Sequence, residues 1–318
     1  MKTIIVGAGV AGLSIGWKLA QAGVDVLILD RARPARGATW AAAGMIAPTA
    51  EGAHADAAEI AFARWSAELW PHFAAQVEAQ SGHRIGYKRD GALMVAMTGD
   101  EARELRAQSN KILLTADEAQ AREPMLSNAV AGALWDGDEA QVDNRALGTA
   151  LAKAFARAGG KLSPNEAVVR IEAEGELRAV HTPFGLYYAD KILIAAGAWS
   201  ADIAIDRPVL PAARPVKGEM LALSPPPGAR LPGQVVWGNG VYLVPREGRL
   251  LIGATMKEAG FDTAVTDEAE GWLLDHAIAL MPSLARWILD EHWAGLRPGS
   301  PDGLPILGET RVKDLYVA

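Results

Sequence analysis

The hydrophobic pattern near the N-terminus changes its period twice between residues 2 and 30. An uninterrupted apolar run, KTIIV, comes first, as in a buried strand. Apolar Leu13, Trp17 and Leu19 then follow in a helical stretch, and a second apolar run is VDVLILD. The pattern predicts strand, helix and strand, which together make one βαβ unit.

Two later stretches have the three- and four-residue apolar spacing of helices. The first covers residues 56–82, ends near Gly82 and is expected to break or kink at Pro71. The second, over residues 144–162, is amphipathic and also has a glycine stop.

From Gly86 the pattern changes to short strands and turns, with a polar helix near residues 100–108. The segment VYLVPREGRLLIGATM predicts a hairpin that turns at Glu247 and Gly248. The strand-like segments AVVRIEAEG and KILIAAGAWSADIA are expected to rejoin the first sheet. Because 318 residues exceed the usual size of one hydrophobic core, we expect two lobes.

The turn after the first strand has the G-x-G-x-x-G spacing, at Gly7, Gly9 and Gly12. Asp30 ends the second strand eighteen positions after Gly12, where dinucleotide-binding folds place an acid for ribose hydroxyls. These features favour a dinucleotide site over a merely structural glycine turn, and the acid disfavours NADP. FAD and NAD both fit this pattern.

The small-residue segment GATWAAAGMIAP helps to choose between these cofactors. Its Ala41, Ala42, Ala43 and Gly44 would let the backbone approach an extended flavin, and Thr39 can donate a hydroxyl to phosphate. Composition alone is equally compatible with a flexible loop. The segment ILIAAGAWS supplies a second place for close backbone approach.

Composition and charge narrow the class of protein. The 31 Lys and Arg against 38 Asp and Glu give a formal net charge of −7, which argues against nucleic-acid binding. Cysteine is absent, which excludes disulfides, thiol catalysis and a flavin attached through sulfur. The N-terminal apolar run reads as part of the βαβ unit and not as a signal peptide, and no apolar run is long enough to span a membrane. We therefore expect a cytoplasmic protein without membrane association.

Several separate blocks carry a family resemblance: IIVGAGVAGLSIGWKLAQAG, GATWAAAGMIAP, RPVKGEM, VYLVP, GATM and WAGLRPGSPDGLPILG. In this order they resemble the glycine oxidase (ThiO) branch of the D-amino-acid oxidase family of flavoproteins, from the first residue nearly to the last. The resemblance implies non-covalent FAD and oxidative deamination of glycine, sarcosine or small D-amino acids to keto acid, ammonia and H2O2. It also implies O2 as electron acceptor and a role in making the thiazole of thiamine.

The expected fold class is α/β, with a Rossmann-like FAD-binding domain whose parallel sheet is flanked by helices. A second, α+β substrate domain is expected on a mixed or antiparallel sheet. The FAD-binding domain is expected to comprise residues 1–85, 142–208 and 295–318, and the substrate domain residues 86–141 and 209–294.

The resemblance also implies site residues. Arg297 matches the family's carboxylate-binding arginine, and the guanidinium fork suits a carboxylate better than Lys does. Tyr242 and Met256 match positions that border the substrate, although ordinary packing would explain both. The FAD-binding residues expected are Gly7, Gly9, Val10, Ala11, Gly12, Asp30, Arg31, Thr39, Ala41, Ala42, Ala43, Gly44, Met45, Val168, Ala196, Gly197 and Trp199. No metal site is expected.

The mechanism implied needs no protein acid or base. Arg297 would orient the substrate, whose Cα hydrogen leaves as hydride to FAD while its neutral amine donates electrons. Two other interpretations stay open: an FAD-dependent D-amino-acid dehydrogenase that reduces a quinone, and a flavin-binding protein with impaired turnover. The second arises because family members continue past KDLYVA into a segment with another arginine and a final helix. Preferred amine and oligomeric state, including a homo-oligomer, are also open.

Overall fold

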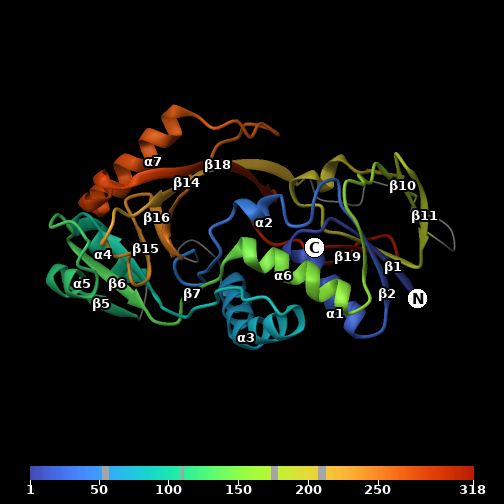
Figure 1. Ribbon diagram of the computed structural model, residues 1–318, viewed down its shortest axis with the longest axis horizontal. Coiled ribbons are helices and arrows are strands. Elements are labelled where there is room, and N and C mark those ends of the chain that lie inside the picture. The colour runs from blue at the N-terminus through green and yellow to red at the C-terminus, as the bar shows by residue number, and fades with distance from the viewer. Residues whose placement is uncertain (52–56, 109–110, 173–177, 207–212) are drawn as a thin grey trace.

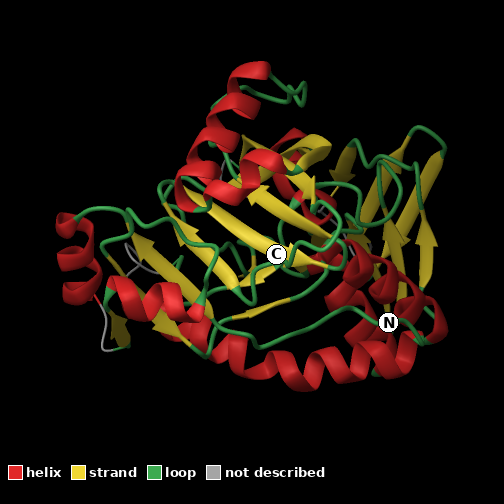
Figure 2. Cartoon of the chain, turned by 60° about the vertical axis from the view of Figure 1, so that its left-hand side comes forward, coloured by secondary structure: helices red, strands yellow, loops and turns green. Residues whose placement is uncertain are grey.

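The computed structural model describes residues 1–51, 57–108, 111–172, 178–206 and 213–318. Two large sheets lie at opposite ends of an elongated molecule, with helices between and around them (Figures 1 and 2). Within the described residues, the helices are α1 (Val10–Gln21), α2 (Ala38–Ala41), α3 (Ala57–Ser81), α4 (Gly99–Gln108), α5 (Ala116–Arg122), α6 (Asn144–Arg157) and α7 (Asp267–Leu280), with 3-10 helices η2 (Gly197–Asp202) and η3 (Pro282–Arg286).

The predicted βαβ unit lies at the centre of the first sheet. Its strand order is β19 (Gly308–Glu309), β20 (Leu315–Val317), β12 (Lys191–Ile194), β1 (Lys2–Val6), β2 (Asp25–Leu29) and β8 (Lys161–Ser163). Neighbouring strands are parallel except β19, which is antiparallel to β20. The central strands are continuously apolar because both faces of the sheet are covered.

Helices cover one face of this sheet, and a small four-stranded sheet covers the other. Ile5 packs on the helical face with Trp17 of α1 and Phe155 of α6, all of which are buried. On the other face, Ile4 packs with Ile171 of a small sheet whose order is β11 (Gly185–Ala189), β10 (Arg178–Thr182), β9 (Arg170–Glu172) and β13 (Ala204–Ile205). The prediction that the segment AVVRIEAEG rejoins the first sheet is therefore wrong for its described part, β9, whereas the prediction for KILIAAGAWSADIA is confirmed by β12, which lies between β20 and β1.

The second large sheet is mostly antiparallel. Its strand order is β18 (Ile288–Gly299), β14 (Arg214–Ser224), β17 (Arg249–Gly253), β16 (Val241–Arg246), β15 (Val235–Gly238), β4 (Ala92–Ala96), β6 (Gly132–Asp136) and β5 (Ile112–Leu114). Strands β15 and β4 pair in parallel, so the sheet is mixed. A two-stranded ladder of β3 (Met45–Ile46) and β7 (Ala140–Gln141) lies between the large sheets.

Local predictions are confirmed at several turns. The hairpin of β16 and β17 turns at Glu247 and Gly248, where Gly248 has φ +76°. Helix α3 ends at Ser81, and Gly82 follows with φ +65°. Of the break or kink predicted at Pro71, the break is wrong, because α3 runs through this residue as one helix, and the kink stays a prediction.

The predicted domain boundary at residues 208 and 209 lies outside the described residues, as do residues 173–175 of the predicted strand. Another predicted boundary, between Ala294 and Gly295, would cut through the 12-residue strand β18. Strands β14 and β18 pair along their whole length, and the pairing begins with Arg214 opposite Gly299. The division into two domains therefore stays a prediction. Within the described residues, no helix is long and apolar enough to cross a membrane.

Candidate functional site

A groove with a volume of about 750 Å³ opens at the carboxyl ends of β1, β2 and β12. This is the edge where open parallel sheets bind dinucleotides, and the volume lies in the range of ligand sites. Among the predicted cofactor residues, those that line this groove are Gly7, Gly9, Val10, Ala11, Asp30, Arg31, Thr39, Val168, Ala196, Gly197 and Trp199.

The glycine turn fits a phosphate-bearing ligand. Gly7 has φ +108°, and a Cβ there would lie 2.3 Å from the Ala195 carbonyl oxygen. A Cβ on Gly12 would lie 2.0 Å from the Gly7 carbonyl oxygen, so this glycine lets α1 start close to the turn. Gly9 has only the Thr39 hydroxyl near its Cβ position, at 3.4 Å, and leaves the helix N-terminus open to an anion.

Asp30 supports the turn directly, which the sequence did not indicate. One carboxylate oxygen accepts the Ala8 N–H at 2.5 Å, and the other accepts the Ala32 N–H at 2.7 Å. Burial raises the pKa of Asp30, and these two bonds oppose that rise. Each oxygen keeps a lone pair for a further donor, so a ribose contact stays a prediction.

Thr39 and Trp199 also form parts of the groove wall. The Thr39 hydroxyl oxygen accepts the Val10 N–H at 2.9 Å, which leaves its own hydrogen free to bond phosphate. The Trp199 ring centroid lies 4.4 Å from the Arg31 guanidinium carbon. Arg31 thus lies along the groove wall, and its predicted contact with a cofactor stays a prediction.

The small-residue segment is held by the protein and is not a loose loop. Arg246 of β16 donates to the carbonyl oxygens of Ala43 and Val142. A Cβ on Gly44, whose φ is +75°, would lie 2.0 Å from the Val142 oxygen. Burial lowers the pKa of Arg246 to about 10, so the guanidinium stays charged at neutral pH. Sequence reasoning missed Arg246.

The same segment leads from the groove to the predicted substrate residues. Ala41, Ala42, Ala43, Gly44 and Met45 do not line the 750 Å³ groove, although Thr39 just before them does. Ala41 and Ala43 are buried in a cluster against which Met45 and Tyr242 also pack. Their contact with a flavin ring stays a prediction.

Arg297 lies beside the groove, since its neighbours Leu296 and Pro298 line it. The guanidinium rests on Gly218, where an added Cβ would lie 2.5 Å from Nη1, and Nη1 donates to the Thr255 carbonyl oxygen at 3.3 Å. The sequence offered no sign that Gly218 makes room for this side chain. Arg297 does not itself line the groove, and it lies in β18 between two residues that do.

Tyr242 lies against Arg297, and Met256 does not close the site. Burial raises the pKa of Tyr242 to about 12, with Arg297 opposing and Glu51 adding to this rise. The Tyr242 hydroxyl also donates to the Met220 sulfur at 3.8 Å. Met256 is 75% exposed, so in this structure it borders the site only through its neighbour Thr255.

A buried acid that the sequence did not single out anchors the turn after β3. Glu139 is 2% exposed, and one of its carboxylate oxygens accepts the N–H groups of Thr49 and Ala50 at 2.7 and 3.3 Å. Burial raises the pKa of Glu139 to about 7, the two backbone bonds oppose this, and Asp136 and Glu51 add to it. The turn that it holds carries Glu51 toward Tyr242.

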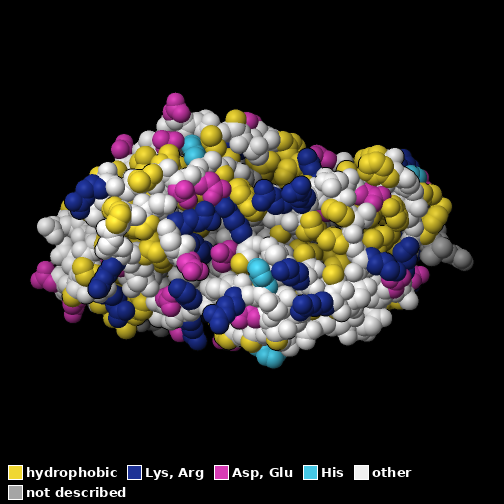
Figure 3. Space-filling view, viewed as in Figure 1, with side chains coloured by type: hydrophobic (Ala, Val, Ile, Leu, Met, Phe, Trp, Pro, Cys, Tyr) yellow, Lys and Arg dark blue, Asp and Glu magenta, His cyan; other side chains and the backbone are white. Residues whose placement is uncertain are grey.

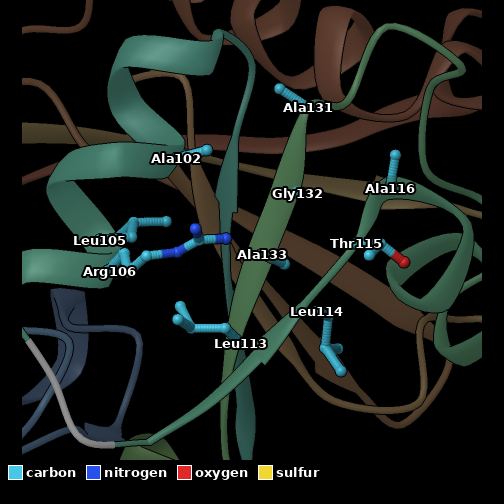
Figure 4. Close-up of a pocket in the computed structure, with 10 residues that line it drawn as sticks. All are labelled: Ala102, Leu105, Arg106, Leu113, Leu114, Thr115, Ala116, Ala131, Gly132 and Ala133. Atoms are coloured by element: carbon cyan, nitrogen blue, oxygen red, sulfur yellow. The ribbon is translucent and has the colours of Figure 1, made fainter.

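Another hollow is unrelated to these residues. It has a volume of about 210 Å³ and lies between α4 and the strands β5 and β6, with the exposed Arg106 reaching across it (Figure 4). Among the described residues no cluster of His, Asp and Glu could hold a metal ion. Positive and negative side chains are mixed over the face in Figure 3, and this mixture differs from the basic band of a nucleic-acid site.

The sheet order, glycine turn and groove define a dinucleotide-binding protein of the α/β class. The chain belongs to the FAD dependent oxidoreductase (DAO) family, whose model matches residues 2–318. The family is FAD-dependent, and the groove's glycine turn, open helix N-terminus and volume fit that cofactor.

Similar proteins agree with this assignment. The chain is 35% identical over 327 residues to a glycine oxidase of Geobacillus kaustophilus, covering 99% of this chain and 86% of that protein. The crystal structure of glycine oxidase from Geobacillus kaustophilus superposes with a TM-score of 0.94 at 34% identity, over 99% of this chain and 88% of that one. The resemblance and the fold class expected from the sequence are thereby confirmed.

Other relatives are longer. A bifunctional protein ThiO/ThiG of Synechocystis is 35% identical over 324 residues, covering 99% of this chain but 48% of that protein. The chain thus spans about half the length of the first curated relatives that it matches.

Proposed function

We propose that this chain uses FAD to oxidise the amine of glycine or another small amino acid or amine, such as sarcosine or a small D-amino acid. The imine formed is hydrolysed by water to a keto acid and ammonia, or methylamine where sarcosine is the substrate, and O2 as the electron acceptor is reduced to H2O2. The reaction serves thiamine thiazole synthesis. The observation that carries the proposal is Arg297, which rests on Gly218 beside Tyr242, between the groove-lining residues Leu296 and Pro298. Similarity to glycine oxidases supports the substrate class.

The residues that would hold FAD are those of the groove and of the small-residue segment. FAD supplies the hydride acceptor when bound. Gly7, Gly9 and the open N-terminus of α1 suit its pyrophosphate, and Asp30 suits its ribose. The run from Ala41 to Met45 would border its ring.

The chain's own contribution to the reaction is binding and orientation. Arg297 would bind the substrate carboxylate through two charge-assisted hydrogen bonds, which limits the positions of the substrate Cα. Tyr242 stays a neutral phenol at physiological pH because its pKa is about 12, so it acts as a hydrogen-bond donor and not as a base. Neither residue has to transfer a proton for the substrate to be oxidised from its neutral amine.

Anaerobic titration tests this function. The FAD-loaded chain is mixed with glycine, sarcosine or D-alanine without oxygen, and the flavin absorbance is followed. Bleaching by at least one of them, followed by peroxide formation on admission of air, is the expected result. A yellow protein that none of the three bleaches would contradict the proposal.

The Tyr242→Phe substitution removes one hydrogen-bond donor and keeps the ring. We expect kcat/KM for glycine to fall by roughly 3- to 10-fold, the range of one neutral hydrogen bond. In the unmodified chain, no ionisation of Tyr242 should affect kcat/KM between pH 8 and about 10, because burial raises its pKa to about 12. The measurement is kcat/KM against pH, with Tyr188→Phe at a half-exposed position as control.

A further inference from the structure

Residues 255–266 connect the substrate side of the site with the cofactor side. This crossing segment lies between β17 and α7, and its Thr255 carbonyl oxygen accepts from Arg297 Nη1 at 3.3 Å. Farther along, Phe261 stacks on Trp199 with ring centroids 5.6 Å apart. Since Trp199 lines the groove, one segment touches both Arg297 and the groove wall.

Two buried charged side chains of β14, Lys217 and Glu219, form hydrogen bonds with this segment. Glu219 is fully buried and accepts the Thr266 N–H at 2.8 Å and the Thr266 hydroxyl at 3.2 Å. Lys217 is 3% exposed and donates to the Asp262 carboxylate at 3.1 Å and to the Ala264 carbonyl oxygen. The Lys217 Nζ atom lies 3.5 Å from the Glu219 Oε1 atom.

The backbone of the segment is tied to the same two residues. Lys217 and Lys257 exchange N–H···O bonds at 2.9 and 3.0 Å. The Glu219 N–H donates to the Thr255 hydroxyl at 2.8 Å, and the Thr255 N–H donates to the Glu219 carbonyl oxygen at 3.2 Å. The crossing segment is thus attached to β14 at its start, its middle and its end.

The buried pair is completed by a histidine of β18. His292 Nε2 lies 3.1 Å from the Glu219 carboxylate, and its Nδ1 lies 3.3 Å from Glu270. A buried ion pair adds little net stability compared with apolar side chains of similar volume, because desolvation offsets the attraction. The pair contributes specific geometry instead, since each charge directs a hydrogen bond at a defined point of the segment.

The opposite face of β14 carries the substrate side. Side chains alternate along a strand, so Gly218 and Met220 face away from Lys217 and Glu219. Gly218 supports the Arg297 guanidinium, and Met220 accepts from the Tyr242 hydroxyl. One strand therefore fixes Arg297 from two directions: directly through Gly218, and through Thr255 of the crossing segment.

We propose that Lys217 and Glu219 are positioning residues that fix the crossing segment, and through it both the Arg297 guanidinium and the Trp199 wall of the FAD groove. The part that concerns Arg297 rests on the proposed function. The part that concerns Trp199 does not, because it requires only that the groove binds FAD.

The experiment uses the FAD-loaded full chain and three variants. Asp262→Ala is the deciding variant. Asp262 is more than half exposed, and its side chain accepts hydrogen bonds only from Lys217 and from the Ala264 N–H among the described residues. Glu219→Gln keeps the shape and removes the central charge. Glu268→Gln is the matched control, because it breaks an exposed ion pair of 2.8 Å between Lys257 of the segment and α7.

Two binding constants are measured: that of FAD for the apoprotein, and that of acetate for the FAD-loaded chain, followed by the flavin spectrum. Acetate has the carboxylate of a substrate but no amine, so it probes Arg297 without turnover. We expect both dissociation constants to rise about 3-fold in Asp262→Ala and about 10-fold in Glu219→Gln, and to change less than about 2-fold in Glu268→Gln. With glycine, KM should rise in proportion while kcat stays within about 2-fold, whereas a merely structural defect lowers kcat through loss of folded enzyme.

Unchanged FAD and acetate constants in Asp262→Ala would overturn the proposal, and this variant decides alone if Glu219→Gln does not fold. Failure of the proposed function gives a different result. The unmodified chain would then neither bind acetate nor be reduced by glycine, while the FAD constant would still test the Trp199 part.

Discussion

Replacing Arg297 by lysine is expected to lower kcat/KM for glycine roughly 100-fold while FAD stays bound. The guanidinium can bind a carboxylate through two parallel hydrogen bonds, whereas the ammonium of lysine is a point charge that would donate one hydrogen bond to the same carboxylate. One charge-assisted hydrogen bond contributes about 1.5–3 kcal/mol, and each 1.4 kcal/mol is about tenfold in rate. The loss should be largest in KM, because the carboxylate is bound in both the ground and the transition state.

The control for this variant is Arg214→Lys. Arg214 lies on the same pair of strands as Arg297, but its side chain is half exposed and pairs with Glu258 at 2.9 Å. A surface pair of this kind contributes little, so kcat/KM should stay within about 2-fold. Equal kinetics of Arg297→Lys and the unmodified chain would show that the carboxylate binds elsewhere. Retention of the flavin spectrum separates this result from loss of the cofactor.

Signals that lie within a few residues of one another could be predicted from the sequence. The turn at Gly7, Gly9 and Gly12 follows an apolar strand directly, and the hairpin at Glu247 and Gly248 joins two apolar runs. Each of these patterns reports a local backbone requirement, such as φ above zero or close approach at a helix start. The structure reproduces both of them.

Contacts between distant residues could not be predicted in this way. Arg246 bonds the Ala43 carbonyl oxygen 203 positions away, and Glu139 bonds the Thr49 N–H 90 positions away. Neither residue has a neighbour in the sequence that marks it, and Glu139 follows an Asp138 that is exposed. Pro71 shows the converse, since a local rule predicted a break or a kink and the helix α3 continues through this residue without a break.

Glu139 is expected to make stability depend on pH in a way that Glu139→Gln removes. The carboxyl has a pKa of about 7 when folded, against an ordinary value of 4.5, chiefly because of burial. A raised pKa means that the folded chain binds the proton more tightly. The associated stability is therefore fully present below pH 4.5 and is lost as the pH rises through about 7.

The variant should gain stability relative to the unmodified chain as the pH rises. The glutamine that replaces Glu139 can still accept the N–H groups of Thr49 and Ala50 through its amide oxygen, and it has no charge to bury. Each pH unit between the two pKa values corresponds to about 1.4 kcal/mol, so the difference in unfolding free energy should grow by about 3 kcal/mol between about pH 5 and 8. Urea unfolding with excess FAD at these pH values measures it, with Glu104→Gln at an exposed position of α4 as control. A difference that stays constant over this range would mean that Glu139 is ionised in the folded chain throughout, and that the turn carrying Glu51 is held by a permanent buried charge.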